Sequence, residues 1–491
     1  MSLSSLPSFP VGLTYDDVLL VPQKSPVRSR KTVRTCTRLS RNIKLQIPIV
    51  ASNMDTVCEH QTAIAMAREG GIGILHRFCS IKEQCDMLSK VKRAQSFLIE
   101  NPRMIMAHQT SEEALEGLKW KGRKGGVGCL MVVDGLSTRK LLGIITRQDL
   151  VIAEAGEPVS KLMTPIDRLV VSHDPGITLD EAREMMRRHR MSNLPIIGKD
   201  NSLMYLVTLA DVVKLTQNRY ASLDVRGRLL VGAAVGVKKD DLTRAAMLVE
   251  AGADVLVVDI AHGHSSICID MLKQLKADPR TNKVDIVAGN IATGEAAEEL
   301  IQAGADGLKI GVGPGSICTT RLVAGSGVPQ LSAVLACTRV ARKHGVPCIA
   351  DGGIKTGGDI CKAIAAGADT VMVGNLLAGT DEAPGRVLVK DGKKVKIIRG
   401  MAGFGANLSK AERESTLDED AFAEMVPEGV EGSVPCKGPL SPIVRQLVGG
   451  LRSGMSYSGA CTIKEMHEKA QFVRMTGSGL RESGSHDISK L

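Results

Sequence analysis

The residues best suited to chemistry lie in one loop, GLKIGVGPGSICTTR, at positions 307–321. Its glycines let the backbone come close to a ligand and present amides or carbonyls to it. Cys318 follows the glycines directly, beside Thr319, Thr320 and Arg321. A cysteine on a loop that follows a strand is a candidate nucleophile. A buried, unreactive cysteine is the alternative interpretation, and position alone favours neither.

Two later loops carry residues suited to a nucleotide. Asp351 and Gly353 follow one apolar run, and Gly374 follows the next. Loops after the last two strands of an α/β barrel frequently bind phosphate. We therefore expect Ser316, Gly353 and Gly374 to surround one phosphate, and Asp351 to accept hydrogen bonds from ribose hydroxyls. Glycines needed only for packing are the alternative.

A repeat indicates the scaffold that brings these loops together. Segments 248–260, 300–313 and 363–374 each contain Ala-Gly-Ala-Asp between a helix end and a short apolar run. The glycine suits a left-handed helix cap, and the run suits a buried strand. Five further buried-strand candidates lie at 47–52, 71–76, 229–236, 284–290 and 346–353. Eight such strands predict a (β/α)8 TIM barrel with its site at their carboxyl ends. A doubly wound open sheet is the alternative, weakened because no G-x-G-x-x-G follows an early strand.

The long segment between the second and third strands predicts an inserted domain, because one βαβ unit needs only about 30 residues. Within it, LLGIITRQDL and LMYLVTLADVV share a strand, then Thr-x-x-Asp, then a helix start. Thr146 and Thr208 suit helix caps. Asp149 and Asp211 either complete those caps or accept hydrogen bonds from ribose. The two halves resemble a pair of CBS motifs, a module that binds adenine or guanine nucleotides in many proteins. The expected domains are the first part of the barrel at 1–95, a tandem CBS (Bateman) domain at 96–218 and the second part of the barrel at 219–491.

Composition argues against several classes of protein. The net charge is +10, but the basic residues are dispersed, and the chain has only 6 Phe, 4 Tyr and 1 Trp. We therefore expect no nucleic-acid partner; a solvated surface or a phosphorylated small ligand suits this charge. The 12 cysteines include no C-x-x-C pair, which fits a reducing compartment. No apolar run reaches the ~18 residues of a membrane span. The final residues, Ser489-Lys490-Leu491, match a peroxisomal address.

Three motifs together resemble one family. KIGVGPGSICTTR, TYDDVLLVP at 14–22 and IADGGIKTGGDI at 349–360 are similar to the IMP dehydrogenase/GMP reductase family, and the resemblance covers nearly the whole chain. Both branches of that family use a thiolate that attacks purine C2 and a nicotinamide cofactor for hydride transfer. The dehydrogenase oxidises IMP with NAD and hydrolyses a covalent intermediate to XMP. The reductase expels ammonia from GMP and reduces the same type of intermediate with NADPH, giving IMP.

The flap separates the two branches. In the dehydrogenase a mobile flap carries an adjacent Arg-Tyr pair whose arginine activates water. The corresponding stretch at 402–427 contains Arg413 but no tyrosine. Asn53 and the run AGNIATGEAAEELIQAGAD at 288–306 also resemble the reductase. The inserted CBS pair, by contrast, is usual in dehydrogenases. The missing tyrosine favours a GMP reductase, with IMP dehydrogenase and a catalytically silent nucleotide-binding protein as alternatives.

The resemblance implies a role for each candidate residue of the barrel. Cys318 is the expected nucleophile, and Thr320 and Glu428 match a proton-transfer pair. The expected contacts to GMP or IMP are Ser52, Asn290, Ser316, Asp351, Gly353, Gly374, Gly400 and Met401, the last two in a flap at about 400–432. Asp259 and Ala261 match the NADPH site. The carbonyls of Gly313, Gly315 and Cys318 match a K⁺ loop of the dehydrogenase branch.

The resemblance also implies regulation, assembly and location. Purine nucleotides are expected at the CBS pair, near Thr146, Asp149, Thr208 and Asp211. The family forms homotetramers, and CBS pairing joins two of them into octamers. A terminal Ser-Lys-Leu on a purine-salvage enzyme resembles glycosomal usage.

Overall fold

The computed structural model describes residues 9–119, 128–217, 220–414 and 426–484. The chain divides into two compact units, one of residues 1–94, 220–222 and 229–491 and one of residues 95–219 and 223–228. The predicted sorting signal Ser489-Lys490-Leu491 lies outside the described residues. Across the described ranges, no helix is both long and apolar enough to cross a bilayer.

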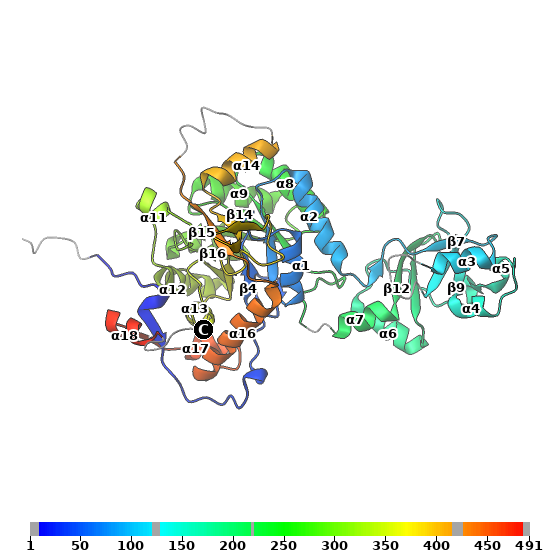
Figure 1. Ribbon diagram of the computed structural model, residues 1–491, viewed down its shortest axis with the longest axis horizontal. Helices are drawn as coiled ribbons and strands as arrows, with labels where there is room; N and C mark the ends of the chain where they lie inside the picture. Colours follow the sequence, from blue (N-terminus) through cyan, green and yellow to red (C-terminus); the bar gives the residue numbers. More distant parts are fainter. Residues whose placement is uncertain (1–8, 120–127, 218–219, 415–425, 485–491) are drawn as a thin grey trace, which may run out of the picture. The chain divides into compact units, whose positions relative to one another are not determined.

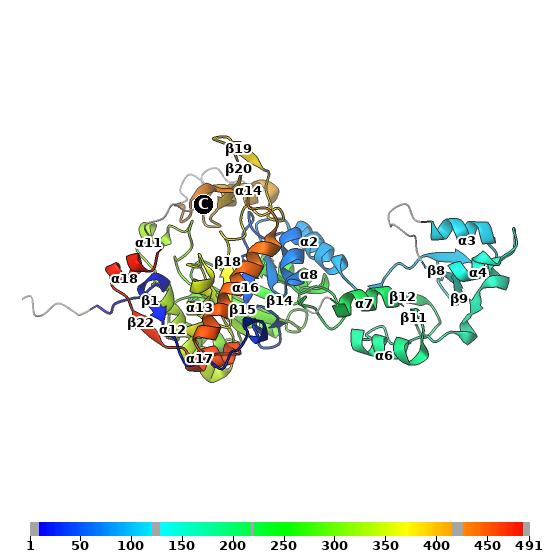
Figure 2. The same ribbon diagram turned by 60° about the horizontal axis from the view of Figure 1, so that its bottom comes forward.

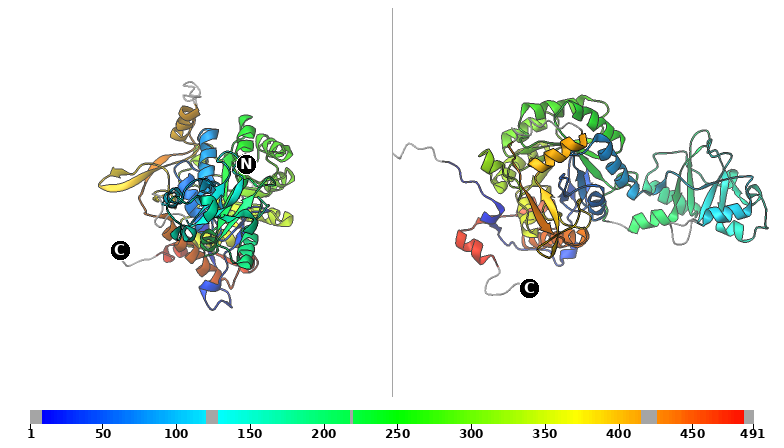
Figure 3. Two further views of the ribbon diagram at one scale, coloured as in Figure 1. Left: turned by 90° about the vertical axis from the view of Figure 1, so that its right-hand side faces the viewer. Right: turned by 45° about the horizontal axis from the view of Figure 1, so that its top comes forward.

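The first unit is a closed barrel of eight parallel strands, which confirms the predicted fold class (Figure 1). In chain order the strands are β4 (Ile49–Ala51), β5 (Ile72–Leu75), β13 (Val231–Val235), β14 (Val255–Asp259), β15 (Asp285–Ile291), β16 (Gly307–Ile310), β17 (Cys348–Asp351) and β18 (Thr370–Val373). The principal helices that follow them are α1 (His60–Arg68), α2 (Ile81–Ala94), α8 (Asp240–Glu250), α9 (Ser266–Ala277), α10 (Gly294–Gln302), α12 (Gln330–Ala341), α13 (Gly357–Ala365) and α16 (Leu440–Tyr457). The right-hand view of Figure 3 shows helices surrounding the strands. The strands read as unbroken apolar runs because both of their faces are covered.

The Ala-Gly-Ala-Asp repeat has a structural explanation in two parts. Its glycines end three helices with left-handed backbone: Gly252 at φ 101°, Gly304 at φ 104° and Gly367 at φ 103°. Its aspartates reach the amide group at the start of the preceding strand. The bonds are Val231 N to Asp254 (2.8 Å), Ile286 N to Asp306 (2.8 Å) and Cys348 N to Asp369 (2.9 Å). Each repeat therefore caps the helix that precedes it and links the start of its own strand to the start of the preceding strand.

A second, antiparallel sheet rises from the chain after β18. It consists of β19 (Leu388–Lys390), β20 (Lys393–Arg399) and β21 (Glu431–Pro435), with Ile398 opposite Gly432. Figure 2 shows the β19–β20 hairpin projecting away from the barrel, and the left-hand view of Figure 3 shows it from the side. Helix α14 (Phe404–Glu414) follows β20. The predicted flap at 400–432 thus starts and ends on this sheet, and residues 415–425 lie outside the described residues.

Smaller elements complete the first unit. They are η2 (Tyr15–Asp17), β1 (Val18–Leu20), η3 (Arg30–Thr32), β2 (Thr37–Arg38), β3 (Lys44–Leu45), α11 (Thr320–Val323), η5 (Arg342–His344), α17 (Ile463–Lys469), β22 (Phe472–Arg474) and α18 (Gly477–Glu482). Strand β1 pairs with β22, which joins the two ends of the described chain.

The second unit contains two sheets, ordered β10-β9-β8-β7 and β11-β12-β6. Its strands are β6 (Leu98–Ile99), β7 (Met104–Met106), β8 (Cys129–Val133), β9 (Leu141–Thr146), β10 (Thr164–Pro165), β11 (Asn193–Ile197) and β12 (Leu203–Thr208). Its helices are α3 (Ser111–Leu118), α4 (Arg147–Val151), α5 (Val159–Leu162), η4 (Ile166–Arg168), α6 (Leu179–His189) and α7 (Leu209–Gln217). Residues of both sheets share one core cluster, so the halves pack as a single body. The CBS assignment of this unit stays a prediction.

The two Thr-x-x-Asp motifs of this unit begin helices, as predicted. Thr146 donates to the Asp149 carboxylate over 2.7 Å, and Thr208 donates to the Asp211 carboxylate over 2.6 Å. The Thr146 amide also donates to Asp149, over 2.7 Å. Both aspartates therefore act as helix caps in this structure. Their predicted contacts to ribose stay a prediction.

Candidate active site

The predicted nucleophile lies on the loop that follows β16. Cys318 is half-buried, and its Sγ lies 3.2 Å from the Thr320 hydroxyl. Thr320 in turn donates to the Glu428 carboxylate over 2.7 Å. Residues 108 positions apart thus form one continuous chain of thiol, hydroxyl and carboxyl groups. Such a chain can move a proton between a carboxyl group and a molecule bound at the sulfur.

Backbone contacts hold this chain together. The Thr319 amide donates to the Glu428 carbonyl over 2.9 Å, and Val430 donates to the Ile317 carbonyl over 3.0 Å. Residues 428–430, just before β21, therefore run beside the cysteine loop, and this fixes where Glu428 lies. Gly400 packs against this segment so tightly that a Cβ added to it would come within 3.0 Å of the Gly429 Cα. A larger residue at position 400 would push the two segments apart.

The predicted ribose and nicotinamide residues meet at one buried lysine. Lys309, on β16, lies 2.9 Å from the Asp259 carboxylate and 3.2 Å from the Asp351 carboxylate. It also donates to the side-chain oxygen of Asn290. The Asn290 amide closes the cluster by donating to Asp351 over 2.9 Å. The ends of strands β14, β15, β16 and β17 are thereby linked through their side chains.

Opposite charges outweigh the effect of burial on Lys309 and Asp259. Burial opposes the charge on Lys309, but the carboxylates of Asp259 and Asp351 outweigh it and hold the pKa of the lysine above its ordinary value. Burial likewise opposes the charge on Asp259, yet Lys309 and Arg77 lower the pKa of its carboxyl group. Asp259 therefore presents a fixed negative charge at the end of β14, next to the exposed Ala261.

The remaining substrate candidates gather at the carboxyl ends of the barrel strands. Ser52 follows β4, and its amide donates to the Val373 carbonyl over 3.0 Å, which brings it beside Gly374. Gly352 lies against the loop that carries Ser316, because a Cβ added to it would come within 3.2 Å of the Gly315 amide. The loops after β16 and β17 are therefore in contact, as a shared phosphate site requires. The Ser316 side chain itself is exposed.

Residue types alone did not indicate Lys309 as a site residue. Lys309 is the one charged residue in a short strand that is otherwise apolar. A charged residue in a strand expected to be buried is the only sequence feature that could have indicated it. Asn53 was recognised only as a reductase-like residue; it is buried and hydrogen-bonds to Asp259, which lowers the pKa of that carboxyl group.

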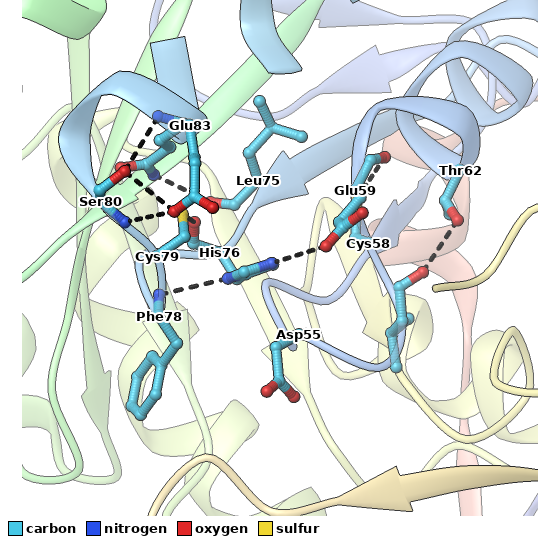
Figure 4. A network of polar contacts seen from close by, with 12 residues as sticks. Asp55, Cys58, Glu59, Thr62, Leu75, His76, Phe78, Cys79, Ser80 and Glu83 are labelled. Atoms are coloured by element: carbon cyan, nitrogen blue, oxygen red, sulfur yellow. Dashed lines mark hydrogen bonds and ion pairs between the residues drawn. The ribbon is translucent and has the colours of Figure 1, made fainter. Parts of the chain in front are cut away.

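A buried histidine links the loops after the first two barrel strands. His76 accepts a hydrogen bond from the Phe78 amide over 3.2 Å, which leaves the proton on its other nitrogen. That nitrogen faces the Glu59 carboxylate at 3.5 Å (Figure 4). Glu59 follows Cys58 on the loop that begins at Ser52, so His76 helps to fix the substrate side of this loop.

The predicted K⁺ loop would bind its ion through backbone carbonyls rather than side chains. Gly313, Gly315 and Cys318 lie on one loop, and the Gly315 carbonyl accepts a hydrogen bond from the Cys318 amide over 3.2 Å. Among the described residues, no three side chains of His, Cys, Asp or Glu are arranged to bind a metal. Binding of K⁺ by backbone carbonyls stays a prediction.

The closed parallel barrel, with a thiol loop and a carboxylate cluster at the carboxyl ends of its strands, has its candidate site where (β/α)8-barrel enzymes have theirs. The family description "IMP dehydrogenase / GMP reductase domain" matches residues 12–486. The chain belongs to the IMP dehydrogenase/GMP reductase family.

Relatives within this family are similar over their full length. The chain is 73% identical over 490 residues to a GMP reductase from Leishmania donovani, covering 100% of both proteins. It is similar to the crystal structure of a C318A variant of GMP reductase from Trypanosoma brucei in complex with guanosine 5'-monophosphate. That match has a TM-score of 0.83 and 73% identity and covers 98% of this chain and 99% of the other. The T. brucei enzyme in complex with guanosine 5'-triphosphate matches with a TM-score of 0.72 and 65% identity, covering 96% and 99% of the two chains.

Proposed function

We propose that this protein is an oxidoreductase that converts GMP, NADPH and two protons to IMP, NADP⁺ and ammonium. The observation that carries the proposal is the chain from Cys318 through Thr320 to Glu428, which places a nucleophile and a proton source on adjacent loops. The similarity to GMP reductases along the whole chain supports the same reaction.

The chemistry follows from this geometry. The Cys318 thiolate attacks C2 of GMP and forms a carbon–sulfur bond. Glu428, through Thr320, delivers a proton to the 2-amino group, because ammonia is a far better leaving group than an amide ion. Loss of ammonia leaves the purine attached to sulfur through C2. Departure of the thiolate, once C2 has been reduced, releases IMP.

The residues present fit a reduced nicotinamide. Its carboxamide offers N–H donors, and Asp259 offers a fixed carboxylate that is partly exposed at the end of β14. Asn53 and Lys309 hold that carboxylate in place. When bound, NADPH supplies the hydride that reduces C2. Asp259 and Ala261 would hold it there.

A pair of spectrophotometric assays tests the proposal. Purified protein is given GMP with NADPH in one cuvette and IMP with NAD in the other, and the absorbance of the reduced nicotinamide is followed. We expect the signal to fall with GMP and to stay constant with IMP. A rise with IMP and no change with GMP would assign the protein to the dehydrogenase branch instead. No change in either cuvette would favour a silent nucleotide-binding protein.

Purine nucleotides are the proposed regulators. The two similar Thr-x-x-Asp halves of the second unit support this, with Thr146, Asp149, Thr208 and Asp211 as the proposed contacts. The T. brucei relative in complex with guanosine 5'-triphosphate supports purine nucleotides as the class of ligand. Calorimetric titration of the full chain with GTP, compared with its Asp149→Asn and Asp211→Asn variants, checks these contacts. The proposed assembly is a homotetramer that pairs into octamers, which sedimentation with and without GTP measures.

Two further proposals come from sequence alone. Backbone carbonyls of the cysteine loop are proposed to bind K⁺, and turnover in K⁺ against Na⁺ buffers tests this. Ser489-Lys490-Leu491 is proposed as a peroxisomal or glycosomal address. Imaging of the protein with and without these three residues tests that location.

A further inference from the structure

A buried ion pair connects the loop after β4 to the end of strand β20. The Asp55 carboxylate accepts a hydrogen bond from Arg399 Nε over 2.8 Å and a second from Nη2 of the same guanidinium. Their positions differ by 344 in the sequence. Asp55 lies on the loop after β4, whereas Arg399 is the last residue of β20. This pair is therefore a long-range clamp rather than a local cap.

Both partners are shielded from water. The Asp55 side chain is 4% exposed, and that of Arg399 is 19% exposed. Both N–H groups of the guanidinium meet the same oxygen, Oδ2 of Asp55, and a charge-assisted pair of this kind is stronger than a neutral hydrogen bond. In Figure 4 the Asp55 side chain points away from Glu59, at the end of the same loop, and from Thr62 in the first turn of α1. Asp55 is thus free of the His76 network and is directed toward the flap.

The clamp includes a third segment and two weaker contacts. Arg399 Nη1 donates to the Gly405 carbonyl over 3.1 Å, which attaches the first turn of α14. The Asp55 amide lies 3.4 Å from the Met401 sulfur, and the Arg399 amide lies 3.4 Å from the Thr56 hydroxyl. The guanidinium therefore holds the end of β20 and the start of α14 against the loop that follows β4.

The neighbours of the pair connect it to the site. Asp55 comes three residues after Ser52 and two after Asn53, which contacts Asp259. Arg399 comes immediately before Gly400 and Met401, the proposed contacts to the purine base. The far end of the β19–β20 hairpin is exposed, whereas β20 is held at its middle by the buried Lys396, which donates to the Thr380 and Ala383 carbonyls, and at its end by Arg399.

We propose that Asp55 and Arg399 are positioning residues that hold the Gly400–Met401 backbone over the purine ring of GMP. The proposal rests on the proposed function and deepens it. Neither side chain touches the reacting atoms; each acts through the segment that it holds. Loss of the pair removes one of two anchors of the base-binding segment; the other, its backbone bonds to residues 428–430, remains and keeps the Cys318–Thr320–Glu428 chain in place.

A double-mutant cycle tests this on the full-length protein. Asp55→Asn and Arg399→Met are each expected to raise KM for GMP by at least about tenfold, because small displacements of binding groups are costly, and to change kcat less than KM. The double variant is expected to resemble the worse single variant rather than the product of both effects, since the two side chains act as one unit. Glu69→Gln is the matched control. It breaks another long-range ion pair, between Glu69 and Arg445 at 3.1 Å, and should leave KM unchanged.

A second readout does not depend on turnover. Iodoacetamide labelling of Cys318, followed by mass spectrometry of its peptide so that the exposed Cys36 does not contribute, is expected to be slowed by GMP bound over the sulfur. In both single variants we expect labelling without GMP at the rate of the unmodified protein, and a concentration of GMP for half-protection at least about tenfold higher. Faster labelling without GMP, together with a lowered thermal midpoint, would mean that the pair only supports the fold, and this would overturn the proposal.

The outcomes separate the inference from the function on which it rests. A KM for GMP in Asp55→Asn and Arg399→Met equal to that of Glu69→Gln overturns the clamp and leaves the reaction intact. Effects that simply multiply in the double variant also overturn it. Failure of the unmodified protein to oxidise NADPH with GMP overturns the proposed function first.

Discussion

The two units of this protein use the same pair of groups for different purposes. In the barrel, the Thr320 hydroxyl donates to Glu428, which lies 108 positions away. In the second unit, Thr146 and Thr208 donate to aspartates three positions away. The oxygen–oxygen distances of these hydrogen bonds are nearly equal, at 2.6–2.7 Å. The hydrogen bond itself therefore does not distinguish the distant pair from the local pairs. What differs is the route of the chain: a local pair begins a helix, whereas a distant pair joins two loops beside a thiol.

The largest expected effect comes from removing the thiol. Cys318→Ala should lower GMP-dependent NADPH oxidation by more than about 10⁴-fold, because no other group can form the covalent bond at C2. The thermal midpoint should hardly change, since the Cys318 side chain is half-buried in a loop. Single-turnover assays check the rate. Cys36→Ala, at an exposed cysteine, is the control and should behave as the unmodified protein.

The distant Thr–carboxylate pair gives the next largest effect. Glu428→Gln keeps an oxygen that accepts the Thr320 hydrogen bond but removes the acidic proton. We expect kcat to fall by roughly 10²–10⁴-fold, the usual contribution of a positioned acid. Stopped-flow measurement of ammonia release checks the step affected. Glu431→Gln, in the same strand region, is the matched control; if it lowered kcat as far, Glu428 would not be the proton donor.

The buried lysine affects stability as well as the site. Lys309→Met leaves the carboxylates of Asp259 and Asp351 without their cation. Breaking a buried ion pair costs about 3–5 kcal/mol, so the free energy of unfolding should fall by that order. Urea denaturation followed by circular dichroism measures it. An unchanged midpoint would show that Asn290 and water can replace the ammonium group, and Lys309→Arg tests whether charge alone is sufficient.

The smallest effect is expected from a local pair. Thr178 caps α6 and donates to Glu181 over 2.7 Å, as the two Thr-x-x-Asp motifs do. Thr178→Ala should cost about 1 kcal/mol of stability in the second unit and leave turnover unchanged. Differential scanning calorimetry and the NADPH assay check both statements. A loss of turnover comparable to that of Glu428→Gln would remove the distinction between local and distant pairs.

Much of the fold could be predicted because its signals are local. The glycine of each Ala-Gly-Ala-Asp repeat marks a left-handed cap, and the apolar runs mark strands that are covered on both faces. Eight buried parallel strands joined by helices are typical of a closed (β/α)8 barrel. The role of the aspartate in the repeat is not evident from sequence, because its partner is an amide at the start of the preceding strand.

The site was predicted less completely, for a related reason. Cys318 and Thr320 stand two positions apart and were visible in one motif. Glu428 was named through the family resemblance, since a carboxylate in a glycine-rich loop has no distinguishing local pattern. The cluster around Lys309 and the ion pair between Asp55 and Arg399 could not be predicted from the sequence. Partners that are far apart in the chain form no recognisable motif.

The sequence by itself determined the barrel, the loop that carries Cys318 and the helix caps of the second unit. These depend on backbone preferences and on apolar periodicity, which act over a few residues. Tertiary structure alone decided which carboxylates surround Lys309, which threonine lies beside the thiol and which segments are paired by Asp55 and Arg399. Burial lowers the effective dielectric and strengthens each pairing, and burial is a property of the folded chain rather than of any segment.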